Sequence, residues 1–196
     1  MIASKQRMWD ERWMSLALHY AQWSKDRGRQ VGAVIVGPDQ EQVSSGWNGF
    51  PRGVDDTIEH RHTRPTKYAF TKHAEENAIL NAARMGASTR GCTMYLPWFP
   101  CANCAGDIVQ AGISCVVVYP FDHDDPRWGE SMKQAAEILF EGGVVVRVLP
   151  GSPPPNQEKL KDRIRFLEWR VQGLLEANNV NVERRREATR QLRNQA

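Results

Sequence analysis

HAEENAIL at residues 73–80 and PCANCA at residues 100–105 are the two stretches around which the chain is organised. Each is predicted to open a helix, and Pro100 suits a helix start. The two helix starts supply one imidazole, His73, and two thiols two residues apart, Cys101 and Cys104. Three nitrogen and sulfur ligands leave the fourth position of a tetrahedral zinc ion open, which is the pattern of a catalytic zinc site.

Glu75 stands two residues after His73 and is not needed as a ligand. A water at the open zinc position loses a proton near neutral pH. Glu75 is placed to move protons between that water and a substrate nitrogen. The joint pattern His-x-Glu and Pro-Cys-x-x-Cys is the signature of zinc nucleobase deaminases.

Other readings of the same residues stay open at this point. A Cys-x-x-Cys pair can be redox-active, or can be completed to a structural zinc site by Cys92 and Cys115, although both lie in apolar strand-like runs where buried free thiols are common. His60 and His62, in the long polar loop 49–67, could bind a second metal.

The 196-residue chain, with 41% apolar residues, is long enough for one domain with an appendage. It has neither an apolar run of membrane-spanning length nor the apolar centre of a signal peptide, so a cytoplasmic protein is expected. Residues 156–196 carry ten basic and six acidic side chains, which leaves 16 basic and 17 acidic side chains in the rest. The net charge of +3 therefore belongs to the tail, and the body is not a basic nucleic-acid-binding surface.

Alternating apolar strands and periodic helices predict an α/β fold with a mixed sheet flanked by helices on both faces. The first helix is expected to pack its apolar and aromatic side chains against the sheet: Trp9, Trp13, Leu16, Ala17, Tyr20 and Trp23. Strands are expected at 31–36, 42–48, 92–96, 114–119 and 144–149, and helices at 8–25, 71–85, 101–111 and 128–140.

Residues 150–155 are a proline-rich linker by composition. We therefore expect a deaminase domain at 1–150 and a basic helical tail at 151–196. The tail has apolar residues at the spacing of a short coiled coil: Leu160, Ile164, Leu167, Val171 and Leu174. A solvated oligomerisation or docking helix is favoured over nucleic-acid binding, because acidic residues interleave with the basic ones.

Over residues 9–149 the chain resembles the zinc-dependent cytidine and deoxycytidylate deaminase superfamily, and within it the deoxycytidylate (dCMP) deaminase branch. The motifs that carry the resemblance are WDERWM at 9–14, SKD at 24–26, VGAVIV at 31–36, GWNGFPRG at 46–53, HAEENAIL at 73–80 and PCANCA at 100–105. The resemblance implies a three-layer α-β-α sandwich with a five-stranded mixed sheet.

The resemblance also implies roles for single residues. His73, Cys101 and Cys104 match the zinc ligands, and Glu75 matches the catalytic proton shuttle. The substrate-binding residues expected on this basis are Asn48, which contacts the sugar, Ala74, whose N–H holds the pyrimidine carbonyl, Trp98 in the pocket floor, and Arg84, linked to phosphate handling. Effector binding is expected at Trp47, Asn48 and Gly49, for dCTP and dTTP, with Mg²⁺ accompanying a triphosphate. The family further implies a homo-oligomer, with a hexamer favoured.

Three departures from the family pattern leave the identity of the base open. Trp47 replaces a tyrosine, Pro97-Trp98-Phe99 replaces a Thr-Leu-Ser stretch, and no tyrosine matches the substrate-contacting one within 119–123. The expected reaction is hydrolysis of dCMP to dUMP and ammonia, in the supply of dTMP precursor. The alternatives are a deaminase of 5-methyl or 5-hydroxymethyl dCMP, of a tRNA adenosine, a nucleoside or a free base, and a nucleotide-sensing binding protein.

Overall fold

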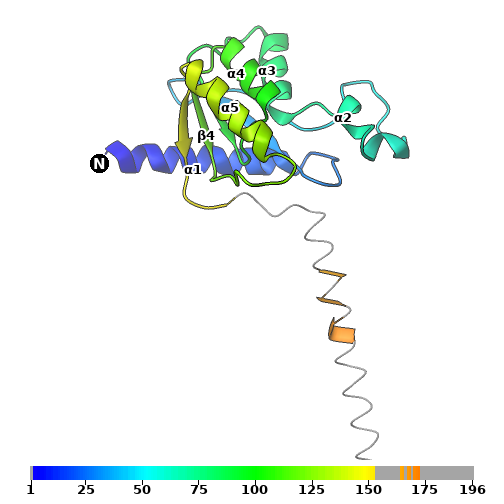
Figure 1. The fold of residues 1–196 in the computed structure, drawn as a ribbon. Helices are drawn as coiled ribbons and strands as arrows, with labels where there is room; N and C mark the ends of the chain where they lie inside the picture. The colour runs from blue at the N-terminus through cyan, green and yellow to red at the C-terminus, as the bar shows by residue number, and fades with distance from the viewer. Residues whose placement is uncertain (1, 153–163, 166, 169, 173–196) are drawn as a thin grey trace, which may run out of the picture. The chain divides into compact units, whose positions relative to one another are not determined.

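The computed structural model describes residues 2–152, 164–165, 167–168 and 170–172, in two units, Met1–Pro154 and Pro155–Ala196 (Figure 1). None of the helices in this described part has the length and apolar character needed to span a bilayer. The named elements are α1 (Ile2–Ala21), β1 (Gly32–Val36), β2 (Gln42–Trp47), the 3-10 helix η1 (Glu59–His62), α2 (Lys67–Phe70), α3 (Ala74–Met85), β3 (Thr93–Leu96), α4 (Ala102–Gln110), β4 (Cys115–Val118), α5 (Gly129–Glu141) and β5 (Val145–Val148).

The five strands form one mixed sheet in the order β2-β1-β3-β4-β5. β1 pairs antiparallel with both β2 and β3, whereas β3, β4 and β5 run parallel. The strands β1 and β4 are buried along their whole length, which explains their unbroken apolar sequences. The predicted five-stranded mixed sheet is confirmed.

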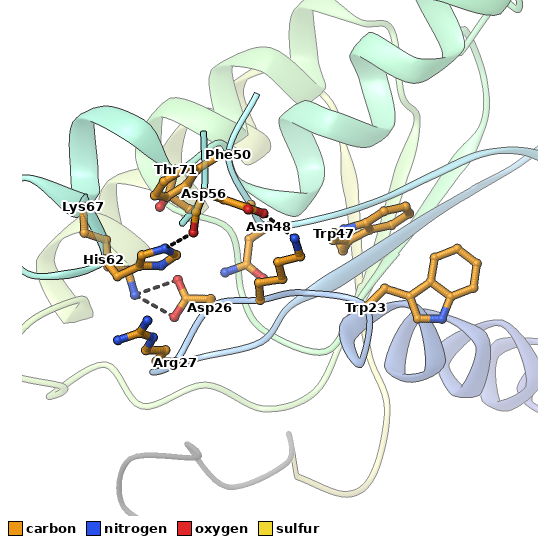
Figure 2. Close-up of a pocket in the computed structure, with 12 residues that line it drawn as sticks. Trp23, Asp26, Arg27, Trp47, Asn48, Phe50, Asp56, His62, Lys67 and Thr71 are labelled. Carbon is orange, nitrogen blue, oxygen red and sulfur yellow. Dashed lines mark hydrogen bonds and ion pairs between the residues drawn. The ribbon is translucent and has the colours of Figure 1, made fainter. Parts of the chain in front are cut away.

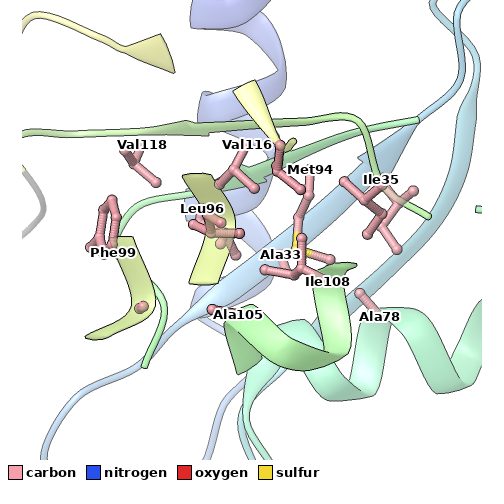
Figure 3. Close-up of a cluster of buried hydrophobic side chains, with 14 of the residues drawn as sticks. Ala33, Ile35, Ala78, Met94, Leu96, Phe99, Ala105, Ile108, Val116 and Val118 are labelled. Carbon is pink, nitrogen blue, oxygen red and sulfur yellow. The ribbon is translucent and has the colours of Figure 1, made fainter. Parts of the chain in front are cut away.

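Helices cover both faces of this sheet, as Figure 1 shows. Alternate residues of β1 point to opposite faces, so Val34 packs on the α1 side and Ile35 on the side of α3, α4 and α5. Figure 3 shows the larger core, between the sheet and these three helices. Its labelled residues are Ala33, Ile35, Ala78, Met94, Leu96, Phe99, Ala105, Ile108, Val116 and Val118.

Gly46 in β2 sets how closely α3 approaches the sheet. A Cβ atom on Gly46 would lie 2.4 Å from the Ala78 nitrogen and 2.6 Å from the Ala74 oxygen. Only a residue without a side chain permits this backbone contact. The contact fixes the first turn of α3, and with it His73 and Glu75.

Two predicted helices have different bounds in the structure. α3 begins at Ala74 rather than Thr71, because His73 has extended backbone angles and Lys72 pairs with Gly49 in an isolated bridge. α1 spans Ile2–Ala21 instead of 8–25. The prediction that Trp23 packs in the core is therefore wrong, since Trp23 lies beyond the helix end and is 51% exposed.

The predicted tail helix is described only in part. Ile164, Leu167 and Val171 are helical and exposed. Leu160 and Leu174, the outer positions of the predicted coiled-coil seam, lie outside the described residues. The coiled coil stays a prediction.

Asp10 joins α1 to two strands through buried hydrogen bonds on the α1 side of the sheet. Its Oδ1 atom accepts hydrogen bonds from the Tyr95 hydroxyl at 2.9 Å and from Arg147 Nη2 at 2.8 Å. Asp10 and Tyr95 are 4% and 1% exposed. A buried carboxylate of this kind stabilises the fold only while its partners are in place.

We expect Asp10→Ala to lower the free energy of unfolding by about 2–3 kcal/mol. Breaking a fully buried ion pair costs about 3–5 kcal/mol, and the loss is smaller here because the Arg147 side chain is 35% exposed. Urea unfolding of the purified protein measures the difference. Glu11→Ala removes the neighbouring, exposed carboxylate, which pairs with Arg7, and is expected to cost under about 0.5 kcal/mol. Equal effects of the two substitutions would contradict the role of Asp10.

Candidate metal centre

The structure brings His73, Cys101 and Cys104 together, with one ligand atom from each within 4.8 Å of the others. The Nδ1 atom of His73 lies 3.5 Å from Cys101 Sγ and 3.3 Å from Cys104 Sγ. A tetrahedral zinc ion with bonds of about 2.1 Å to nitrogen and 2.3 Å to sulfur separates such atoms by about 3.6 Å. The donor types and their spacing therefore fit Zn²⁺ in a site with an open fourth position.

Both ligand segments are held at the starts of helices. His73 caps α3 and Cys101 caps α4, and each carbonyl accepts the first helical hydrogen bond, from Asn77 N–H and Ala105 N–H respectively. In addition, the Ala102 N–H donates to the Ser131 hydroxyl of α5 at 3.0 Å. These contacts set the direction of the ligands, and the positive ends of the two helices favour anionic sulfur.

The ligand atoms are already coupled to one another electrostatically. Hydrogen bonding from Cys104 lowers the pKa of the Cys101 thiol to about 4, and the hydrogen bond with Cys101 raises the pKa of His73 to about 9. The shift at Cys101 favours negative charge on its sulfur, whereas the hydrogen bond with Cys101 and burial raise the pKa of the Cys104 thiol. A cation at the same place would take over the role of the imidazole proton.

Glu75 lies in the first turn of α3, next to the ligand group, and is 6% exposed. Burial raises the pKa of its carboxyl group, while the positive charge of His73 opposes that rise. A buried carboxylate with a raised pKa is suited to accept and release a proton. It is the placement expected of a general acid/base beside a metal-ligand group.

Asn48 directly follows β2, and its side chain fixes the backbone before β1. Its Oδ1 atom accepts from the Val31 N–H at 2.8 Å, and its Nδ2 atom donates to the Arg29 carbonyl at 2.9 Å. The next residue, Gly49, pairs with Lys72, the neighbour of His73. One amide N–H of Asn48 has no acceptor among the described residues and is free for a ligand.

Of the other predicted substrate residues, Ala74 and Trp98 adjoin the metal-ligand segments, whereas Arg84 does not. Ala74 is fully buried at the start of α3, where helical N–H groups lack an intrahelical partner. Trp98 precedes the cysteine segment, and its buried Nε1 has no hydrogen-bond partner. Arg84 is exposed in the last turn of α3, ten residues and about 15 Å along the helix from Ala74, so it is not part of this group within one chain.

Several residues near the ligand group were not identified from the sequence. Phe121 stacks on Phe99 at 3.9 Å, and the Trp128 ring lies 6.3 Å from the His73 ring. Arg29 lies over the Trp98 ring with its guanidinium 4.0 Å from the ring centroid. In the sequence, only one feature pointed to Phe121 as a site residue: it lies in the segment that lacks the family tyrosine. No motif pointed to Arg29, Trp128 or Ser131.

A cavity of about 210 Å³ adjoins Asn48 on the side of the long loop (Figure 2). Trp47, Asn48 and Gly49, the predicted effector residues, all contribute to its wall. The cations in its wall are paired with acids: Lys67 with the buried Asp26 at 2.6 Å, Lys25 with Asp56, and Arg27 with Glu59.

The alternative metal sites are not supported within the described residues. No group of three ligand-type side chains there contains His60, His62, Cys92 or Cys115. The ring of His62 instead hydrogen-bonds to the Asp56 carbonyl and stacks on Phe50. Cys92 and Cys115 are buried with the apolar core, as their apolar sequence context predicted.

Comparison with known proteins matches the part of the chain that holds the metal-ligand group to zinc-binding deaminases. The family model "Cytidine and deoxycytidylate deaminase zinc-binding region" matches residues 7–120. An uncharacterised deaminase of Aliivibrio fischeri is 42% identical over 72% of this chain and 94% of its own length. Human deoxycytidylate deaminase is 40% identical over 71% of this chain and 78% of its own. The crystal structure of dCMP deaminase from cyanophage S-TIM5 with dCMP and dUMP superposes with a TM-score of 0.59, at 27% identity, over 71% of this chain and 95% of that one.

Proposed function

The chain belongs to the cytidine and deoxycytidylate deaminase family, and we propose that it hydrolyses dCMP to dUMP and ammonia. The observation that carries this proposal is the group of His73, Cys101 and Cys104 with the buried Glu75 beside it. Relatives about 40% identical are deoxycytidylate deaminases, and a solved relative binds dCMP and dUMP. The enzyme is a zinc-dependent hydrolytic deaminase.

His73, Cys101 and Cys104 would hold the zinc ion, which when bound supplies a nucleophile by lowering the pKa of a water. Glu75 accepts a proton from that water and passes it to N3 of the base. Once the water oxygen has bonded to C4, Glu75 would take the remaining proton of that hydroxyl group and deliver it to the amino nitrogen, so that the C4–N bond breaks, a C4 carbonyl forms and ammonia departs. The burial of Glu75 excludes competing water from these transfers.

The residues around Glu75 hold the substrate in place. We propose that the Ala74 N–H donates to the pyrimidine carbonyl and that the remaining amide N–H of Asn48 donates to the sugar. Because the same Asn48 amide fixes the Val31 and Arg29 backbone, its position is set before the substrate binds. Trp98 would border the substrate, and Arg84 would need a neighbouring subunit to reach a nucleotide.

A substrate panel tests the function directly. Ammonia release is measured with cytosine nucleosides, monophosphates and triphosphates, and with 5-methyl and 5-hydroxymethyl dCMP. We expect dCMP to give the highest kcat/KM. A preference of tenfold or more for a 5-modified dCMP would favour the alternative function, deamination of a modified dCMP, which Trp98 and the Phe99–Phe121 stack motivate. If the protein released ammonia from none of these compounds, the proposal would be contradicted.

Regulation and assembly are further parts of the proposal. dCTP and dTTP, with Mg²⁺, would bind at Trp47, Asn48 and Gly49 in the loop-side cavity. A triphosphate there would compete with the acids that now pair the lysines and Arg27. A homo-oligomer, with a hexamer favoured, is supported by the exposed apolar side chains of Phe140, Val145 and Val148.

The division into a deaminase domain, 1–150, and a tail, 151–196, remains our proposal, as does a docking or oligomerisation role of the tail rather than nucleic-acid binding. A cytoplasmic location also stays a prediction.

A further inference from the structure

Arg29 is a half-buried arginine whose backbone is fixed and whose charged group is not. Its N–H donates to Asp26 Oδ1 at 3.2 Å, and its carbonyl accepts from Asn48 Nδ2 at 2.9 Å. The guanidinium lies over the Trp98 ring, with Cζ 4.0 Å from the ring centroid, and no acceptor for its N–H groups is found among the described residues. Stacking on an aromatic ring holds a guanidinium in place while leaving its edge donors available.

Trp98 adds a second donor without an acceptor, its buried Nε1. Arg29 and Trp98 border one cavity of about 150 Å³, together with Phe99, Phe121 and Met132. Buried donors in folded proteins are nearly always hydrogen-bonded, and leaving one unpaired is costly. The unpaired Trp98 Nε1, at the same cavity as the Arg29 guanidinium, therefore points to a ligand that carries acceptor atoms.

Charges of both signs act on Arg29, and its own positive charge is what would bind an anion. Burial lowers the pKa of Arg29, and the positive charges of Arg127 and Arg64 act in the same direction, against the charge of Asp125. Asp122 and Asp125 also border the cavity. Their Oδ1 atoms, however, already accept backbone N–H groups of their own turns, at 2.9 Å in each case.

The cavity is also at a suitable place relative to the metal-ligand group. Trp98 stands three residues before Cys101, and the Asn48 amide links Arg29 to the segment that pairs with Lys72, beside His73. When the base of a mononucleotide lies at the metal, the sugar separates its phosphate from the metal-ligand group. We propose that Arg29 binds the 5′-phosphate of the substrate nucleotide, which rests on the proposed deamination of dCMP.

The test compares dCMP with deoxycytidine, which lacks the phosphate. We expect Arg29→Ala to lower kcat/KM for dCMP by about 10–100-fold, because it removes charge-assisted hydrogen bonds. The value for deoxycytidine should stay within about twofold, and Arg29→Lys should retain part of the dCMP preference. The matched control is Arg12→Ala, since Arg12 also stacks on a tryptophan, Trp9, at 5.0 Å but lies on α1. Arg12→Ala should change neither the kcat/KM for dCMP nor that for deoxycytidine.

Equal losses for dCMP and deoxycytidine, or no loss for either, would overturn the role of Arg29. A second measurement does not depend on turnover: calorimetric binding of dCMP and of deoxycytidine to the zinc-loaded Glu75→Gln protein, with and without Arg29→Ala. If Arg29→Ala weakens the binding of dCMP but not that of deoxycytidine, the role of Arg29 is supported even when the wild-type protein deaminates neither compound. The absence of deamination would contradict only the proposed function. Thermal unfolding of each variant identifies any that fails to fold.

Discussion

Replacing Glu75 by glutamine is expected to reduce kcat for dCMP by at least about 10²–10⁴-fold while the protein keeps one zinc per chain. The amide has the shape of the carboxyl group but cannot accept a proton from water, which removes the general acid/base contribution. The fold should tolerate the change, since Glu75 is buried and burial disfavours its charged form. Ammonia release and metal analysis on the same preparation measure the two quantities.

The neighbouring carboxylate provides the control. Glu76 is half-buried and forms an ion pair with Lys72. Glu76→Gln should leave kcat within a few-fold of the wild type. If Glu75→Gln turned over dCMP at the wild-type rate, Glu75 would not be the proton shuttle, and the mechanism would need another base.

The metal-ligand group could be predicted from the sequence because its geometry is local. His73 and Cys101 each stand directly before a helix, so two short motifs fix the direction of three side chains. The sheet was equally predictable, since β1 and β4 are unbroken apolar runs. In both cases the signal lies within a few neighbouring residues.

The contacts that shape the rest of the site are not local. Arg29 and Trp98 are 69 residues apart, and nothing in the spacing of either marks their stacking. The exposure of Trp23 follows from α1 ending at Ala21, two residues earlier, which aromatic periodicity could not show. The resemblance at Asn48 suggested a sugar contact, whereas its backbone hydrogen bonds emerged only from the folded chain.

Loss of the metal should remove activity and part of the stability together. Chelation of the wild-type protein is expected to abolish ammonia release and to lower the melting temperature, because a ligand that binds only the folded state stabilises it by mass action. Readdition of Zn²⁺ should restore both. Cys104→Ala, which removes one of three protein ligands, should hold less than about a tenth of the wild-type zinc at micromolar metal, and its melting temperature should no longer respond to chelator.

Cys92→Ala separates this site from the four-cysteine alternative. Cys92 is also a buried free thiol, but it packs in the core and lies outside the ligand group. This variant should keep one zinc per chain, full chelator sensitivity and deaminase activity, at a small cost in stability from the lost sulfur. Zinc loss in Cys92→Ala equal to that in Cys104→Ala would show that the metal is held by the cysteines as a structural ion, and the open coordination position on which the proposed chemistry depends would disappear.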